Sequence, residues 1–173
     1  MDEIIIIALE AEAPELAKRD NVFFSGVGKV NAALCAAELI AKYNPKTVWN
    51  FGTAGGITLK SGLHEMKNFV ERDRQGCPAS LGIIVQPEEK LISFGEGYTC
   101  STGDDFVMDP NLEIPADVVE MEAFAIAKAC HRAGVDFRCF KYVSDSADGD
   151  SVDDWISNVA NGEPHYIKVL DNK

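Results

Sequence analysis

The sequence predicts an α/β fold, built as one domain over residues 1–173. Three observations lead to this prediction. Strand and helix signals alternate along the chain, the apolar run Ile4–Leu9 is continuous as in a strand buried on both faces, and no repeat or linker interrupts the pattern. A chain of 173 residues also fits one domain and is long enough to bury a core.

The first half is expected to hold three strands and one helix. The predicted strands are Ile4–Leu9, Val22–Phe24 and Thr47–Phe51. Lys29–Tyr43 is rich in Ala and Leu and predicts a helix, which Asn44-Pro45 ends. The segment Gly52–Gly56 is predicted to be a tight turn that closes the third strand and lets a ligand approach the backbone.

The second half is expected to continue the alternation. The predicted strands are Lys67–Arg72, Leu81–Val85, Asp117–Met121 and Phe137–Val143. Gly76-Cys77-Pro78 and Gln86-Pro87 are predicted turns. Ala123–Arg132 predicts a helix with Gly134 as its C-cap, and Val152–Val159 predicts the last helix.

Charge and composition exclude several classes of partner. Sixteen basic and 28 acidic residues leave a net charge of −12, which repels nucleic acid and anionic membranes. The apolar run Ile4–Ile7 is too short to span a membrane and follows acidic residues, so it is not a signal peptide. A small neutral or cationic ligand is therefore the expected partner.

The cysteines and histidines predict no metal site. The five cysteines are scattered without a CxxC pair, and none of the three histidines lies at zinc-like spacing from them. The cysteines are expected to be reduced thiols in a cytoplasmic protein. The acidic stretch Asp145–Asp154 is not an EF-hand, because aligning Gly149 as the loop glycine places Trp155 at the twelfth ligand position.

Acidic side chains follow several of the predicted strands. Glu12 follows the first strand, Glu120 and Glu122 lie in the segment VEMEA at Val119, and Asp145 follows Ser144 after the last strand. In an open α/β sheet, ligands bind beyond the carboxyl ends of the strands. Any one of these carboxylates alone would more often be structural, but four together predict a chemical site.

These residue types suit the cleavage of a sugar–base bond. Such a reaction uses an acid that protonates the departing base and a carboxylate that activates water. Asp145 is the predicted acid, Glu12 the predicted base, and Glu122 the predicted acceptor for ribose hydroxyls. Thr53 offers a hydroxyl, and Phe106 and Trp155 are candidates for stacking on the base, although most buried aromatic residues belong to cores.

Several segments resemble the nucleoside phosphorylase/nucleosidase superfamily, most closely the methylthioadenosine/S-adenosylhomocysteine nucleosidases. They recur in the family's order and are ALEAE at Ala8, SGVGKVNAAL at Ser25, NFGTAGGI at Asn50, STGDDF at Ser101, VEMEAFAIAKAC at Val119 and the Ser144-Asp145 pair. The resemblance implies a nucleoside phosphorylase-like three-layer α/β/α sandwich with a central twisted mixed β-sheet. It also implies a homodimer that hydrolyses an adenine nucleoside without metal or cofactor, a reaction of purine salvage.

The resemblance also assigns roles by position. Asp145 would protonate the purine at N7, and Glu12 would activate the water. The implied substrate-binding residues are Thr53, Phe106, Glu120, Met121, Glu122, Ser144 and Trp155. Among them, Met121 and Glu122 would hold the ribose and Phe106 would stack on the base.

Departures from the family pattern leave alternatives open. Phosphorylases of the superfamily hold phosphate with an arginine before the glycine segment, where this chain has Trp49-Asn50-Phe51, so water is favoured as the nucleophile unless Arg72 or Arg74 returns to the site. The chain is also shorter than usual between the first strand and Ser25 and before Ser101. The alternatives are a purine nucleoside phosphorylase, a hydrolase for another modified nucleoside such as futalosine or a deazapurine nucleoside, and a non-catalytic nucleoside-binding protein.

Overall fold

The computed structural model describes residues 1–73, 91–109 and 113–173. The strands are β1 (Glu3–Ile7), β2 (Val22–Phe24), β3 (Thr47–Gly56), β4 (Gly62–Glu71), β5 (Leu91–Ser93), β6 (Tyr98–Thr102), β7 (Val118–Glu120) and β8 (Asp136–Asp145). The helices are α1 (Lys29–Tyr43), α2 (Ala123–Ala133), α3 (Ser151–Asn158) and α4 (Glu163–Asp171), with short 3₁₀ turns η1 (Glu10–Glu12) and η2 (Leu16–Lys18).

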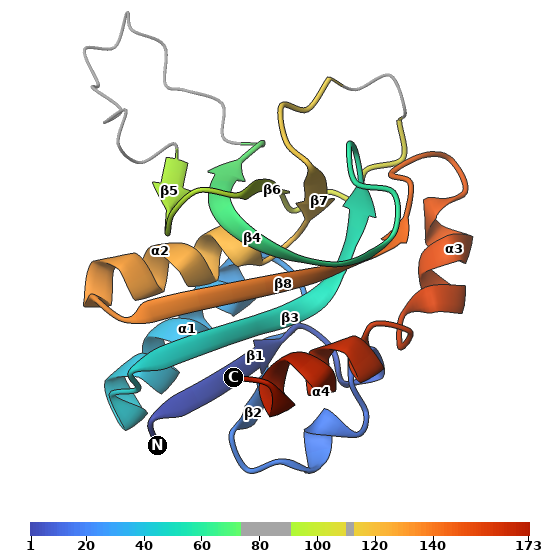
Figure 1. Cartoon of the computed structure of the whole chain (residues 1–173). Helices are drawn as coiled ribbons and strands as arrows, with labels where there is room; N and C mark the ends of the chain where they lie inside the picture. The colour runs from blue at the N-terminus through green and yellow to red at the C-terminus, as the bar shows by residue number, and fades with distance from the viewer. Residues whose placement is uncertain (74–90, 110–112) are drawn as a thin grey trace, which may run out of the picture.

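These strands belong to one mixed sheet with the order β2-β1-β3-β7-β6-β4-β5. The long strand β8 pairs with β3 in parallel and with β4 in antiparallel orientation. Because β3 also reaches β4 through β7 and β6, these five strands close on one another (Figure 1). The sheet is therefore curled at the end where β3, β7 and β8 finish.

Helices cover both faces of the sheet, which confirms the predicted three-layer architecture. On one face, α1 and α2 pack on alternate residues of β1, with Ile4 and Ile6 in the shared apolar cluster. On the other face, Ile5 and Ile7 pack in a second cluster with Tyr166 of α4 (Figure 1). A strand buried on both faces needs apolar residues at successive positions, as the run of isoleucines provides.

The predicted turn at Gly52–Gly56 is wrong, because β3 continues through it to Gly56. The glycines serve close contacts rather than chain reversal. A Cβ atom on Gly55 would lie 2.8 Å from Asp145 Oδ1, and one on Gly56 would lie 2.1 Å from the Leu59 carbonyl oxygen. Side chains are therefore excluded here, although the backbone is extended and paired with β8 as far as Asp145.

Val22–Phe24 and Lys29–Tyr43 are found with their predicted bounds, whereas other predicted elements have shifted ends. The predicted strand Lys67–Arg72 begins earlier, at Gly62, and the predicted strand Phe137–Val143 extends to Asp145, so Ser144 and Asp145 are its last residues. Helix α4 and strands β5 and β6 were not predicted. The predicted strand Leu81–Val85, with the turns on either side of it, lies outside the described residues.

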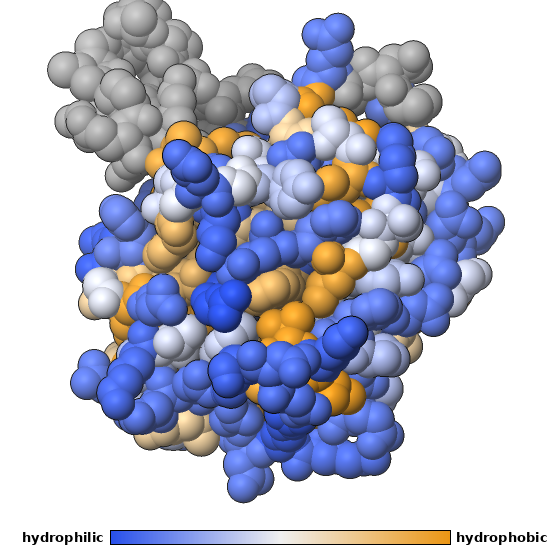
Figure 2. All heavy atoms as spheres, in the orientation of Figure 1, coloured by the Kyte–Doolittle hydropathy of each residue, from blue (hydrophilic) through white to orange (hydrophobic). Residues whose placement is uncertain are grey.

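The surface agrees with the acidic composition. Hydrophilic residues dominate the face in Figure 2, with hydrophobic residues in small groups near its middle. No helix in the described ranges is long and apolar enough to cross a membrane. In those ranges Cys35, Cys100, Cys130 and Cys139 are free thiols, whereas Cys77 lies outside them.

Candidate active site

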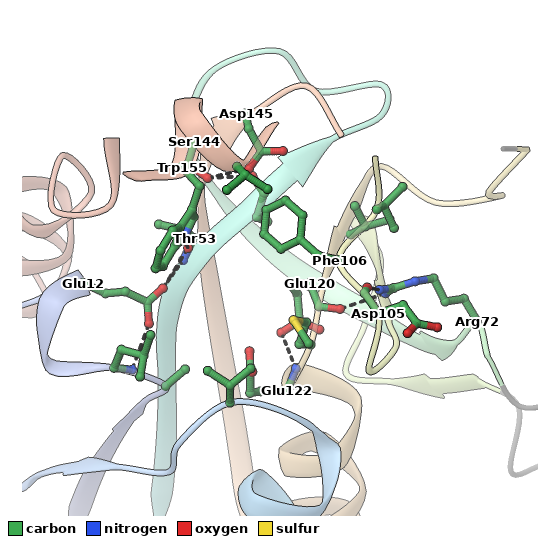
Figure 3. Close-up of a pocket in the computed structure, with 18 residues that line it drawn as sticks. Glu12, Thr53, Arg72, Asp105, Phe106, Glu120, Glu122, Ser144, Asp145 and Trp155 are labelled. Atoms are coloured by element: carbon green, nitrogen blue, oxygen red, sulfur yellow. Dashed lines mark hydrogen bonds between the residues drawn. The ribbon is translucent and has the colours of Figure 1, made fainter. Parts of the chain in front are cut away.

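One cavity of about 380 Å³ brings together all nine residues predicted from the sequence. It lies where β1, β3, β7 and β8 end their pairing and is bounded by α3 and the segment around Phe106 (Figure 3). The nine residues lining it are Glu12, Thr53, Phe106, Glu120, Met121, Glu122, Ser144, Asp145 and Trp155. They come from six separate parts of the chain.

Glu12 is buried and held by three hydrogen-bond donors. Its Oε1 accepts the Thr53 backbone N–H and the Thr53 hydroxyl, both at 2.8 Å. Its Oε2 accepts the backbone N–H of Leu9 at 3.1 Å, at the start of η1. An ionised carboxylate offers about four acceptor positions, so one position on Oε2 is left for a further donor, such as water in the cavity.

Close approach of Glu12 to β3 requires a glycine. A Cβ atom on Gly52 would lie 3.3 Å from Glu12 Oε1 and 3.3 Å from Lys141 Nζ, tighter than ordinary contact. Gly52 thus lets the carboxylate of Glu12 and the ammonium of Lys141 both reach the backbone of β3. A buried positive charge therefore lies near the predicted base.

Glu120 forms the centre of a buried ionic network. Its Oε2 accepts the N–H groups of Glu122 and Ala123 at 2.9 and 2.8 Å and lies 3.0 Å from Lys141 Nζ. Its Oε1 accepts the Thr102 hydroxyl. Burial acts to raise the pKa of Glu120, but Lys141 and the hydrogen bonds outweigh it, so the net pKa is lowered.

Glu122 has a different environment although it lies only two residues further. In the described structure its carboxylate accepts one hydrogen bond, from the Gly28 N–H at 2.8 Å. Burial, followed by the negative charge of Glu120, raises the pKa of Glu122 to about 7. The carboxyl group faces the cavity with acceptor positions still available (Figure 3).

Asp145 lies across the cavity from these carboxylates at the end of β8. Its Oδ2 accepts the Ser144 hydroxyl at 2.8 Å, and its Oδ1 accepts the Ala147 N–H at 3.0 Å. Each oxygen keeps a second position that can carry a proton or meet a ligand. The register shift between β3 and β8 lies at this point, where Gly55 pairs with Asp145.

Arg72 holds the segment that carries Phe106. Its guanidinium donates to the carbonyls of Ser101 and Glu120, both at 2.8 Å. It also donates to the carbonyls of Gly103 and Asp105, directly before Phe106. The Phe106 ring, 39% exposed, points into the cavity from this segment (Figure 3).

Trp155 enters the cavity from α3. Its indole Nε1 donates to the Thr53 hydroxyl oxygen at 2.9 Å, the same hydroxyl that contacts Glu12 (Figure 3). The α3 helix is also tied to β8, because the Asn158 amide donates to the Ser144 carbonyl at 3.0 Å. Trp155 is therefore connected through the Thr53 hydroxyl to Glu12, the predicted general base.

Sequence reasoning missed Lys141 and the apolar lining of the cavity. Lys141 is 1% exposed in β8, but Arg138 in the same strand is a second charge, so the sequence did not single out Lys141 as a buried one. The added apolar lining includes Leu9, Val27 and Val152. Short apolar residues spread over the chain carry no local signal for a shared cavity.

The geometry can support acid–base chemistry on a small, largely apolar ligand. Carboxyl groups lie at opposite sides of the cavity, and an aromatic ring lies between them (Figure 3). Within the described residues, no group of three or more His, Cys, Asp or Glu residues is placed to hold a metal ion. The carboxyl groups that line the cavity can transfer protons.

Comparisons with known proteins show the family of this chain. The family model described as "Phosphorylase superfamily" matches residues 11–66 and 76–171. The 5'-methylthioadenosine/S-adenosylhomocysteine nucleosidase of Shewanella halifaxensis is 31% identical over 198 residues, covering 95% of this chain and 85% of that protein. The protein of that name from Shewanella piezotolerans is 32% identical over 198 residues, with the same coverage. Both alignments are longer than the 173 residues of this chain, so these relatives carry additional segments.

Solved structures show the same fold. A mutant of the Helicobacter pylori nucleosidase with 5'-methylthioadenosine in its active site has a TM-score of 0.85 at 18% identity and covers 99% of this chain and 98% of its own. A futalosine hydrolase mutant of Helicobacter pylori has a TM-score of 0.79 at 19% identity and covers 93% of each chain. The chain therefore belongs to the phosphorylase superfamily and, within it, to the 5'-methylthioadenosine/S-adenosylhomocysteine nucleosidases, a family of N-glycosyl hydrolases.

Proposed function

We propose that this protein hydrolyses the N-glycosidic bond of an adenine nucleoside such as methylthioadenosine or S-adenosylhomocysteine and releases the free base. The observation that carries the proposal is the placement of Glu12, Glu122 and Asp145 around one cavity that also holds an aromatic ring. The nucleosidase relatives, 31% identical over nearly the whole chain, support the same reaction.

In the proposed reaction, Asp145 gives a proton to N7 of the purine while the bond between the sugar and N9 breaks. The bonding electron pair leaves with the base, which the proton neutralises. Glu12 takes a proton from water, which attacks the sugar carbon on its other side. The free acceptor position on Glu12 Oε2 suits this step, since its other three positions are filled by Thr53 and Leu9. Glu122 and Met121 would hold the ribose, and Phe106 would stack on the base.

Water rather than phosphate is the proposed nucleophile. Phosphate needs a cation that is free to bind it. The Arg72 guanidinium donates to four backbone carbonyls, and the Lys141 ammonium pairs with Glu120. The cavity is lined by carboxyl groups, whose negative charge repels phosphate. Arg74 lies outside the described residues.

The first test is base release from a panel of nucleosides, measured by chromatography with and without phosphate. The panel is methylthioadenosine, S-adenosylhomocysteine, adenosine, inosine, futalosine and a deazapurine nucleoside. Adenine release that does not depend on phosphate is expected. Release of ribose-1-phosphate would favour a phosphorylase, and binding without any product would favour a nucleoside-binding protein.

The acid assignment is tested by Asp145→Asn, which keeps the shape and removes the transferable proton. We expect kcat to fall by roughly a thousandfold, within the range of a lost acid catalyst, with unfolding unchanged. Asp148→Asn is the matched control, because Asp148 is close in sequence but does not line the cavity. Near-normal turnover by Asp145→Asn would overturn the assignment.

We also propose that the protein works as a homodimer through the outer face of α1. Val30 and Leu34 are 69% and 58% exposed on this helix, and Val27 beside them lines the cavity. Covering these side chains with a second copy would remove apolar surface from water close to the site. Light scattering should show a dimer, and Leu34→Glu should shift it toward monomer. A wild-type chain that stays monomeric at high concentration would contradict the proposal.

The proposed setting is the cytoplasm, in purine salvage. The free thiols of the described residues suit a reducing compartment, and the released base is a substrate for salvage. Fractionation of cells that express the protein would test the location.

A further inference from the structure

We propose that Trp155 is a positioning residue that orients the base Glu12 through the Thr53 hydroxyl. The inference rests on the proposed function, because it assigns Trp155 to the water-activating step of that reaction. It differs from a stacking role on the purine, since the contact that matters is the indole N–H rather than the ring face.

The hydrogen bonds between these three side chains have a fixed direction. The indole N–H is a donor and has no acceptor, so in the 2.9 Å contact the Thr53 oxygen must accept. A hydroxyl has only one hydrogen to give. With one acceptor position of Thr53 taken by Trp155, its hydrogen points to Glu12 Oε1 at 2.8 Å.

This direction fixes the orientation of the Glu12 carboxylate. Thr53 donates to Glu12 Oε1 through both its backbone N–H and its hydroxyl, which holds that oxygen on the backbone of β3. The Leu9 N–H holds the other oxygen from η1. The carboxylate plane is thus set by three donors, and the remaining position on Oε2 is the one that meets water.

The place of Trp155 in the chain links the two sides of the site. It lies 102 residues from Thr53 and belongs to α3, whose Asn158 holds the backbone of Ser144 beside the acid Asp145. The α3 helix therefore touches the base side through Trp155 and the acid side through Asn158. Through these two contacts, one helix holds both the Glu12 side and the Asp145 side of the site.

The test is a double-mutant cycle with Trp155→Phe and Thr53→Val, assayed for hydrolysis of methylthioadenosine. Trp155→Phe keeps an aromatic ring and removes the N–H. We expect kcat to fall roughly tenfold, as for a misplaced catalytic group, with KM within about twofold of wild type. Thr53→Val should lower kcat at least as much. Adding Trp155→Phe to Thr53→Val should cause no further loss of kcat, because the hydroxyl that connects Trp155 to Glu12 is already absent.

The outcomes separate this inference from its alternatives. A loss from Trp155→Phe that is as large in the Thr53→Val background as in the wild type would overturn it. A rise in KM with kcat unchanged would also overturn it, because that is the signature of a ring that only binds substrate. Ser157→Ala, on the exposed face of α3, is the control for the helix and should behave as wild type. Wild-type protein that releases no base from any nucleoside would instead refute the proposed function itself.

Discussion

Glu120 and Glu122 lie two residues apart, yet they occupy opposite kinds of environment. The carboxylate of Glu120 meets Thr102, Lys141 and two backbone N–H groups. The carboxylate of Glu122 meets one backbone N–H and faces the cavity. Accordingly the pKa of Glu120 is lowered, whereas that of Glu122 is raised to about 7. The contrast indicates that Glu120 organises the site and Glu122 is kept available for a ligand.

The largest expected effect is on stability, from Glu120→Gln. This change leaves the ammonium of Lys141, 1% exposed, without its counterion, and breaking a buried ion pair costs about 3–5 kcal/mol of unfolding free energy. Glu122→Gln should leave the unfolding free energy unchanged or raise it, because it removes a charge that burial disfavours. Urea denaturation at neutral pH measures both.

A double variant tests whether the loss of stability in Glu120→Gln comes from the unpaired charge of Lys141. The double variant with Glu120→Gln and Lys141→Met removes both charges, so it should lose less stability than Glu120→Gln alone. Equal losses of unfolding free energy for Glu120→Gln and Glu122→Gln would contradict the inference that the two residues have different roles.

The next effect is the dependence of stability on pH. The pKa of Glu122 is raised from 4.5 to about 7 in the folded protein. Between these values the folded state binds more protons than the unfolded state, so this stabilisation is present below pH 4.5 and is lost as the pH rises through about 7. At about 1.4 kcal/mol per unit of pKa, the loss is roughly 3 kcal/mol.

Subtracting the Glu122→Gln profile isolates that contribution. Unfolding free energies of wild type and Glu122→Gln are compared by urea titration across this range. The variant should gain on the wild type as the pH rises. Parallel profiles would mean that Glu122 titrates with an ordinary carboxyl pKa.

The same contrast shows how far sequence reasoning reaches. Glu12, Glu122 and Asp145 were found because each follows an apolar strand, a local pattern that puts a carboxylate at the edge of a sheet. The separate environments of Glu120 and Glu122 were out of reach, since they depend on Lys141, a residue from another strand. Pairing between distant strands leaves no mark in the sequence around either residue.

The fold shows the same division. The isoleucines of β1 predicted a strand buried on both faces, and the three-layer architecture that the family resemblance implied is confirmed. The extension of β3 through Gly52–Gly56 was missed, because a glycine run reads as a turn unless the side chains that crowd it are known. Helix α4 was not predicted, although its buried Tyr166 and Leu170 lie four residues apart, as on one face of a helix.

A smaller effect, on substrate recognition, follows from the free acceptor positions of Glu122. If ribose hydroxyls donate to its ionised carboxylate, Glu122→Gln should raise KM about tenfold, the loss of one charge-assisted hydrogen bond. KM of the wild type should also fall as the pH rises through about 7, where the carboxyl group ionises. Steady-state kinetics with 2′-deoxy and 3′-deoxy substrates checks the contact, because the variant should discriminate against them less than wild type does. Equal discrimination by both proteins would remove Glu122 from ribose binding.

The smallest effect concerns Arg72, which links the backbone of Glu120 to the segment before Phe106. Its guanidinium reaches the carbonyls of Glu120 and Asp105 together, and a lysine ammonium cannot span both. Arg72→Lys should therefore loosen the Phe106 segment and raise KM a few-fold, roughly 1 kcal/mol, with kcat nearly unchanged. Arg138→Lys is the matched control, since Arg138 pairs with Glu65 away from the cavity and should leave KM unaltered. A fall in kcat with unchanged KM would contradict this prediction. It would mean that Arg72 acts through Glu120 on the reacting groups and not through Phe106 on binding of the base.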